Sequence, residues 1–314
     1  MASNFSPLPL DGLNTYSLSD RKSKVSREDF ASPWQKGKSF SEFLDALPDI
    51  LGSRDLKTVI QAVVTAYKAQ KVVLTGMGAH VIKVGLNPIL IDLLNRDVIT
   101  AIALNGAGII HDFELAFAGK TSEDVAAALG DGSFGMAKET CEHLGAAIKL
   151  AAAENIGLGA AVGRYINQNE FPYADQSLLA AAERLQKPAT VHVAIGTDII
   201  HMHPSFDPAA AGKATHHDFR LFAAVVAELS HGVYFNVGSA VIMPEIFLKA
   251  VSLVRNLGHA VSDLTTVNMD FIRHYRPMTN VVNRPTADHG RGINLVGHHE
   301  IMLPLIAAGI IERI

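Results

Sequence analysis

The chain of 314 residues has a single cysteine, Cys141. One cysteine excludes a disulfide within the chain, and a reducing, cytoplasmic setting is the simplest expectation for such a sequence. Cys141 lies in a helical pattern, and we interpret its thiol as a packing group rather than a nucleophile. A fold stapled by disulfides is therefore excluded.

The chain also lacks a long uninterrupted apolar run. Its most apolar stretch, Leu144 to Val162, contains Lys149 and Glu154, whereas a membrane-spanning helix needs ~20 consecutive apolar residues. Residues 1–38 are polar and contain no apolar segment typical of a targeting signal. We expect a soluble protein with no membrane partner.

Neither sign of charge is in large excess. The formal net charge is −4, so the overall field attracts neither nucleic acid nor an anionic membrane. We expect no nucleic-acid partner, and a small neutral or cationic substrate fits this balance better.

The composition predicts a large buried core, because 48% of the residues are hydrophobic and only 18% are charged. Residues 1–38, which contain Pro7, Pro9, Pro33 and many serines, are expected to form an N-terminal arm that lies over the surface or over a neighbouring subunit. Trp34 is the residue of this arm that would gain most from docking. Residues 39–314 contain no strong linker and are expected to form one α/β domain.

Short apolar runs that end in glycine turns organise this domain. Two such units stand back to back in Lys71 to Gly119, where the runs 71–75 and 98–104 each lead through a turn into a helical pattern. Similar runs at 190–195, 233–237 and 260–267 follow. Apolar strands that alternate with helices predict a doubly wound, mostly parallel sheet of Rossmann-like type.

The turns at the strand ends predict a binding site for the cofactor NAD. Ligands of parallel sheets sit at the carboxyl ends of the strands, where helix N-termini offer free amides to a phosphate. No turn is a complete G-x-G-x-x-G, and any one glycine could serve backbone geometry alone, so the prediction depends on their repetition. The candidate cofactor residues are Gly76, Gly78, Asn105, Gly106, Gly108, Asp198, Gly238, Ser239 and Asn268.

Histidine is the main candidate for chemistry. His111 and Asp112 follow the second glycine turn and His203 follows the third strand, so these three are the candidate catalytic residues, with a histidine moving the proton. If the segment is extended, His201 and His203 share one face, and an alternative is that they hold a divalent metal that activates water. We interpret the paired histidines at 216–217 and 298–299 as surface residues or caps.

The segment Asn105 to Glu114, with its flanking strands, resembles deoxyhypusine synthase. Similar segments recur in the family's order at Gly196 to Asp198, at Asn236 to Val241 and at Thr265 to Phe271. The resemblance implies a Rossmann-like fold, NAD at the strand ends, and a homotetramer with sites at a dimer interface.

The chain departs from that family at one chemical group. The family forms an imine on a lysine of a C-terminal loop, whereas Ile293 stands at that place here and no lysine follows Lys249. We therefore expect not a true deoxyhypusine synthase but an NAD-dependent enzyme of transferase or oxidoreductase type that acts on a small, possibly amine, substrate. The alternatives are a metal-dependent hydrolase or lyase, and a non-catalytic paralogue.

Two segments lack helical or strand periodicity. Residues 205–213, rich in proline, alanine and glycine, are expected to form a mobile loop over the strand ends, and Arg273 to Gly297 is expected to form a long loop of functional importance.

Overall fold

The computed structural model describes residues 5–314. Its centre is one six-stranded sheet with the strand order β3-β2-β1-β4-β5-β6, in which every neighbouring pair is parallel. The strands are β1 (Val73–Met77), β2 (Ala101–Asn105), β3 (Ala189–His192), β4 (Val233–Val237), β5 (Leu264–Asp270) and β6 (Gly290–Val296). The predicted doubly wound, parallel, Rossmann-like sheet is confirmed.

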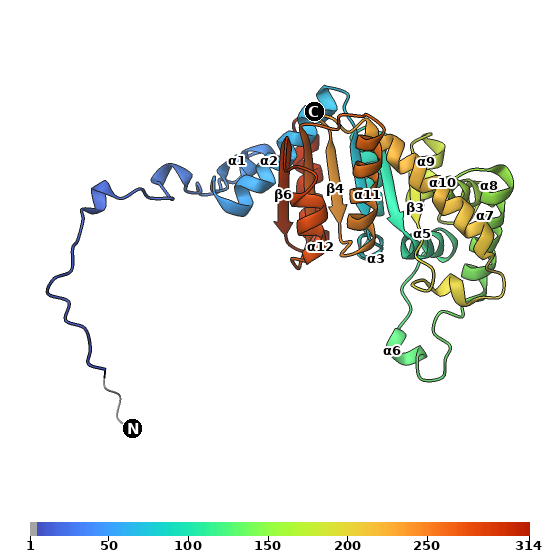
Figure 1. Ribbon diagram of the computed structural model, residues 1–314. Coiled ribbons are helices and arrows are strands. Elements are labelled where there is room, and N and C mark those ends of the chain that lie inside the picture. The colour runs from blue at the N-terminus through green and yellow to red at the C-terminus, as the bar shows by residue number, and fades with distance from the viewer. Residues whose placement is uncertain (1–4) are drawn as a thin grey trace.

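Helices cover both faces of the sheet (Figure 1). They are α1 (Phe40–Ala46), α2 (Leu51–Lys68), α3 (His80–Lys83), α4 (Asn87–Asn95), α5 (Gly106–Ala118), α6 (Val125–Ala128), α7 (Lys138–Glu154), α8 (Leu158–Gln168), α9 (Leu178–Arg184), α10 (Pro208–Ala227), α11 (Ile242–Asn256), α12 (Tyr275–Pro277) and α13 (His299–Ile311). Single turns form at η1 (Leu18–Asp20), η2 (Arg27–Asp29), η3 (Ala174–Gln176) and η4 (Ile199–Met202), and η5 (Met278–Asn283) is a π-helix.

Alternating strand residues build two cores. On β4, Phe235 and Val237 pack with the helices of one face, which include α2, α4, α5 and α13. Tyr234 points to the other face and packs with α10, α11 and η5, where its ring stacks on Phe247 with centroids 3.7 Å apart. Because both faces are covered, β1, β3 and β4 are buried at every position, so their sequences do not alternate between buried and exposed residues.

Among the described residues, no helix combines the length and apolar character that a bilayer crossing requires. The thiol of Cys141 is buried in α7.

The described part of the arm runs away from the body of the molecule (Figure 1). Its apolar side chains from Phe5 to Leu18 are exposed, Phe5 by 90% and Leu10 by 71%. Trp34 is half-exposed and meets the ring of Phe43 edge-on, with centroids 5.6 Å apart. Residues 1–4 of the predicted arm lie outside the described residues, and its docking on a neighbouring subunit stays a prediction.

The expectation of a long loop at Arg273 to Gly297 is wrong in part. The segment forms α12, η5 and the edge strand β6. In β6 only Ile293 and Leu295 are buried; Asn294 lies between them, and Gly292 precedes them. A pattern of so few apolar residues gives a weak strand signal, although its period of two is correct.

The mobile loop expected at 205–213 is also shorter in the structure. Helix α10 begins at Pro208, and the side chain of Asp207 accepts a hydrogen bond of 2.9 Å from Ala210 N. Asp followed by Pro is a common helix start. The aspartate carboxylate accepts a hydrogen bond from a free backbone amide, and proline at the first helical position has no amide hydrogen that needs a partner.

The two halves of the sheet meet where β1 lies beside β4. The backbone continues this pairing into the turn after β1, since Gly78 N donates to Val237 O at 2.9 Å, and the turn after β4 is held to β5 by Gly238 N, which donates to Met269 O at 3.0 Å. A Cβ atom on Gly78 would lie 2.2 Å from Gly238 O. Only glycine therefore allows these two turns to approach so closely.

We predict that Gly78→Ala lowers the free energy of unfolding by about 2–4 kcal/mol, because the added methyl group overlaps backbone that cannot move aside. Gly52→Ala is the matched control, since a Cβ atom at this helical position meets nothing within 4 Å. Urea unfolding of both variants provides the measurement. Equal stabilities would contradict the close approach of the turns.

Candidate functional site

A cavity of about 210 Å³ opens at the carboxyl ends of β2 and β3. We call it the β2–β3 pocket. Its wall comes from α3, from α5, from the turn after β3 and from the loop that carries α6, which hangs below the strand ends in Figure 1. Its polar lining residues are Lys83, His111, Glu114, Ser122, Glu123, Thr197 and Asp198.

A chain of hydrogen bonds orients His111 in this pocket. The Thr121 hydroxyl donates to Glu114 Oε2, and the Thr140 hydroxyl donates to Glu114 Oε1 at 3.0 Å. Thr121 Oγ1 therefore accepts from His111 Nδ1, which lies 2.7 Å away. This network assigns the ring proton to Nδ1 and leaves the Nε2 lone pair of His111 as an acceptor.

The environment keeps His111 neutral. Burial lowers the pKa of its imidazole to about 4, and the nearby positive charge of Lys83 acts in the same direction. At pH 7 the side chain is therefore an uncharged acceptor rather than an imidazolium.

Asp198 places a carboxylate at the N-terminus of α5. A Cβ atom on Gly106 would lie 2.1 Å from Asp198 Oδ2, so the carboxylate lies against the first turn of the helix. Burial raises the pKa of Asp198, whereas His201 and the Thr197 hydroxyl act in the opposite direction. The positive end of the α5 dipole also favours the charged form. This helix end therefore already holds an anion supplied by the protein.

The other cofactor candidates on β2 and α5 have structural tasks. The Asn105 side chain accepts a hydrogen bond of 3.1 Å from Gly108 N and so caps α5. A Cβ atom on Gly108 would lie 3.0 Å from Leu104 Cβ, so this glycine lets helix and strand pack closely.

The structure does not bring Asp112 into the pocket. Its side chain is fully buried and faces the start of α9, where it accepts hydrogen bonds from Ser177 Oγ at 2.6 Å and from Leu178 N at 2.8 Å. Burial raises the pKa of Asp112 to about 6, although these hydrogen bonds act to lower it. Asp112 caps a helix, and its position after His111 on α5 necessarily turns it to another face.

His201 and His203 are not arranged as a metal pair. His201 Nδ1 accepts from Gly196 N at 3.1 Å and from Asp198 N at 3.3 Å, so this lone pair holds the turn after β3. His203 Nδ1 lies 2.8 Å from Ser205 Oγ, outside the lining of the β2–β3 pocket. Within residues 5–314, no three histidine, cysteine or acidic side chains are grouped to hold a metal ion.

Two further cofactor candidates are interior residues. Asn268 is 1% exposed and lies in a row of amides, accepting from Asn236 Nδ2 at 2.7 Å and donating to Asn294 Oδ1 at 2.8 Å. The Cβ position of Gly76 is 2.6 Å from the hydroxyl of Tyr234, so this glycine makes room for the ring. Neither residue faces the β2–β3 pocket.

The turn from β4 to α11 has an unusual neighbour. The Ser239 hydroxyl accepts a hydrogen bond of 3.2 Å from Met243 N and caps α11. A Cβ atom on Gly238 would lie 2.7 Å from His299 Nε2. His299 is 1% exposed, and neither of its ring nitrogens has a hydrogen-bond partner among the described residues.

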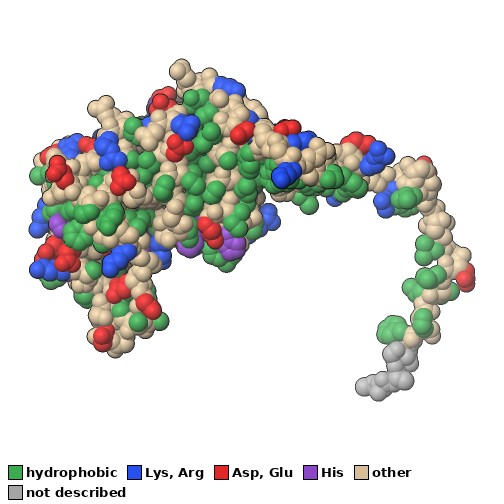
Figure 2. All heavy atoms as spheres, turned by 180° about the vertical axis from the view of Figure 1, so that it is seen from behind, with side chains coloured by type: hydrophobic (Ala, Val, Ile, Leu, Met, Phe, Trp, Pro, Cys, Tyr) green, Lys and Arg blue, Asp and Glu red, His purple; other side chains and the backbone are tan. Residues whose placement is uncertain are grey.

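Other titratable groups surround His299. Burial lowers its pKa and the charge of Asp270 raises it, while the ring of His80 lies edge-on with centroids 5.7 Å apart. Figure 2 shows histidine and acidic side chains gathered at this lower edge of the molecule. His299 was expected to be a surface residue or a helix cap, and the sequence carries no signal that separates it from its exposed neighbour His298.

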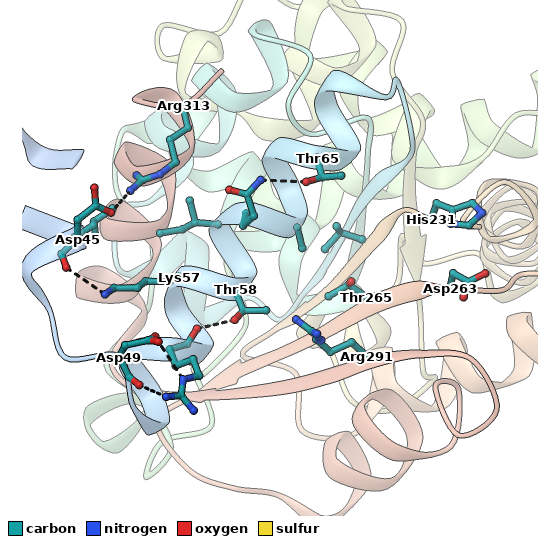
Figure 3. Close-up of a pocket in the computed structure, with 16 residues that line it drawn as sticks. Asp45, Asp49, Lys57, Thr58, Thr65, His231, Asp263, Thr265, Arg291 and Arg313 are labelled. Atoms are coloured by element: carbon teal, nitrogen blue, oxygen red, sulfur yellow. Dashed lines mark hydrogen bonds and ion pairs between the residues drawn. The ribbon is translucent and has the colours of Figure 1, made fainter. Parts of the chain in front are cut away.

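A larger cavity of about 590 Å³ lies at the opposite edge, between α2 and the amino ends of β4, β5 and β6 (Figure 3). Several of its charges already pair with one another, Arg313 with Asp45 at 3.0 Å and Arg54 with Asp49 at 3.4 Å. Ligands of parallel sheets bind at the carboxyl edge, so we place the candidate site in the β2–β3 pocket.

Comparison with known proteins supports the fold. No protein-family model and no curated protein matches the sequence. The solved structure of unliganded AgrE has a TM-score of 0.53 at 13% identity, over 84% of this chain and 34% of that chain. The complex of AgrE with ornithine and NAD+ has a TM-score of 0.52 at 13% identity, with the same coverage.

A structure from Entamoeba histolytica, provisionally assigned as a deoxyhypusine synthase, has a TM-score of 0.51 at 12% identity. The match covers 90% of this chain and 96% of that one, whereas this chain spans only about a third of AgrE. At such identities the likeness establishes a shared fold alone.

We predict that the ring of His111 titrates with a midpoint near pH 4, and that Lys83→Gln raises this midpoint because it removes a nearby positive charge. Lys71→Gln, a change of the same kind just before β1, leaves the midpoint unchanged. Histidine ring NMR resonances followed against pH measure it. A midpoint at the ordinary histidine value would contradict the buried, hydrogen-bonded environment.

Proposed function

We propose that this protein binds NAD(H) along the carboxyl edge of its sheet and acts on a small amine substrate held in the β2–β3 pocket. The observation that carries the proposal is the pocket itself, a polar cavity at the carboxyl ends of two parallel strands in which a neutral His111 presents a free lone pair. The shared fold with AgrE, which has been solved with ornithine and NAD+, supports the cofactor.

The residues fit a dinucleotide phosphate better at the β4–α11 turn than at the β2–α5 turn. The carboxylate of Asp198 already lies against the first turn of α5 and would repel a phosphate there. At the other turn, α11 begins at Ile242, and the ring of His299, which has no hydrogen-bond partner among the described residues, lies against Gly238. Free amides at the start of α11 and the N–H of this ring are suitable donors to an anion.

The charges of the β2–β3 pocket favour an amine. Glu114, Glu123 and Asp198 line it, against the single positive charge of Lys83. Three carboxylates around one small cavity attract a cation and disfavour an anionic substrate. The proposed substrate therefore carries an ammonium group that pairs with the carboxylates of the pocket.

In this scheme a bound nicotinamide would accept a hydride from the carbon that carries the amine. The contribution of the protein is to hold that carbon in the pocket and to manage the proton. His111 Nε2 takes the proton from the amine nitrogen, while Thr121 and Glu114 keep the ring in the required tautomer through Nδ1. The hydrogen bond from Nδ1 to Thr121 is kept when Nε2 takes up the proton.

The alternatives receive less support. A metal-dependent hydrolase needs a ligand group that the described residues do not assemble. A non-catalytic paralogue would be favoured by a site filled with Ile293 and neighbouring aliphatic side chains. Ile293 instead lies buried within β6, and the polar side chains converge on the β2–β3 pocket.

We predict that NAD+ binds to the wild-type protein and that Val241→Glu weakens this binding about tenfold or more, because a carboxylate at the start of α11 repels the phosphates. Val241 is 45% exposed and precedes α11 directly, so an acid there suits the helix dipole and spares the fold. Isothermal titration calorimetry gives the affinities.

Val241→Gln is the matched control, since it has the same shape without the charge. Affinity equal to that of the wild type is expected for this variant. Absence of NAD+ binding to the wild-type protein would overturn the cofactor proposal. Equal effects of Val241→Glu and Val241→Gln would show that the phosphates do not bind at this turn.

A further inference from the structure

Lys83 is the one positive charge that lines the β2–β3 pocket, and no acidic side chain neutralises it. None of the ion pairs formed by the described residues includes Lys83. Its charge nevertheless acts on His111, whose pKa it helps to lower. The ammonium of Lys83 therefore lies near the catalytic candidate and is available to an anion.

The carboxylates of the pocket differ in how far they are already satisfied. Both oxygens of Glu114 accept hydrogen bonds from threonine hydroxyls. Glu123 uses Oε2 to accept from Gly135 N at 2.9 Å, and Asp198 Oδ2 accepts from the Thr197 hydroxyl at the longer distance of 3.3 Å. Oxygens of Glu123 and Asp198 thus remain for a ligand, whereas Glu114 serves His111.

From this arrangement we infer that the substrate is a small zwitterion rather than a simple amine, with its ammonium group at Asp198 and Glu123 and its carboxylate at Lys83. The inference rests on the proposed function of the same pocket and names the class of molecule that the pocket takes. A cavity of about 210 Å³ holds the volume of about seven water molecules, which suits a short amino acid.

The same charges exclude two related classes of ligand. A diamine of equal length would place its second ammonium group beside Lys83, and a dicarboxylate would place a second anion beside Asp198 and Glu123. Like charges within one small pocket disfavour both ligands relative to the zwitterion. Selectivity for the zwitterion therefore depends on Lys83 together with the two acids.

Binding of the zwitterion also changes His111. A carboxylate paired with Lys83 screens the positive charge that lowers the pKa of His111, so that pKa rises and Nε2 becomes a stronger base. A diamine adds positive charge to the pocket and lowers the same pKa further. Binding of the zwitterion therefore also makes His111 a stronger base.

Three four-carbon probes test the inference, namely 4-aminobutanoate, 1,4-diaminobutane and butanedioate. Calorimetry on the full chain measures their affinities with and without NAD+, and histidine NMR follows the pKa of His111 in each complex. The wild-type protein is expected to prefer 4-aminobutanoate over both other probes and to show an upward shift of the His111 pKa with it alone.

Lys83→Gln is expected to weaken 4-aminobutanoate about threefold to fivefold, the size of effect typical of a single exposed ion pair, and to strengthen the diamine. Glu123→Gln is expected to weaken both amines. Lys71→Gln removes the same charge at a site outside the pocket and should leave all three affinities unchanged.

A wild-type preference for the diamine or the diacid, failure to bind any of the three, or a preference that survives Lys83→Gln would overturn the inference. A loss of NAD+ affinity in Lys83→Gln with unchanged probe affinities would overturn it too, because Lys83 would then serve the cofactor. If 4-aminobutanoate binds in a manner that depends on Lys83 while NAD+ does not bind at all, the inference stands and the cofactor proposal alone falls.

Discussion

The hydrogen bond from Gly78 N to Val237 O joins the two halves of the sheet just beyond the ends of β1 and β4. From this junction β2 and β3 extend to one side, and β5 and β6 extend to the other. Every strand runs in the same direction, so all carboxyl ends share one edge. The candidate pocket, the β4–α11 turn and the histidines near it lie together for this reason, although they come from distant parts of the sequence.

The distribution of charge along that edge depends on which helix N-terminus already holds a carboxylate of the protein. At α5 the carboxylate of Asp198 takes the place that an external anion would need, and with Glu114 and Glu123 it gives the β2–β3 pocket an excess of negative charge. At α11 only the Ser239 hydroxyl caps the helix. One edge of a single sheet can therefore attract cationic and anionic ligand groups at different places, which is what the proposed binding of a cofactor through its phosphates beside an amine substrate requires.

Most of the fold could be predicted from the sequence, because buried parallel strands show themselves as short apolar runs that end in glycine. The prediction failed at β6, where Ile293 and Leu295 are the only buried apolar side chains, and at the start of α10, where Pro208 concealed a helix. It also began β5 too early. Val261 and Asp263 have positive φ angles, so the chain turns before the strand begins at Leu264.

The site could be predicted less well, because adjacent residues face different directions. His111 and Asp112 are neighbours in the sequence, yet one opens into the pocket and the other caps α9. His298 and His299 differ in the same way: His298 is exposed, whereas His299 is 1% exposed and has no hydrogen-bond partner within residues 5–314. Lys83 had no motif to mark it, since its importance arises only when α3 and α5 are brought together.

The geometry gives a structural context for the isoleucine at position 293, where the family has a lysine. In the family that the sequence resembles, the C-terminal loop supplies an amine that becomes covalently bound to the substrate. Here Ile293 is part of the core, and the amine nearest to His111 in the pocket lining is that of Lys83, which comes from α3 near the first strand. Lys83 is exposed on α3, and in the proposed site it acts through its charge rather than through a covalent bond. A lysine that binds a carboxylate through charge and a neutral histidine that accepts a proton together suit chemistry without a covalent imine.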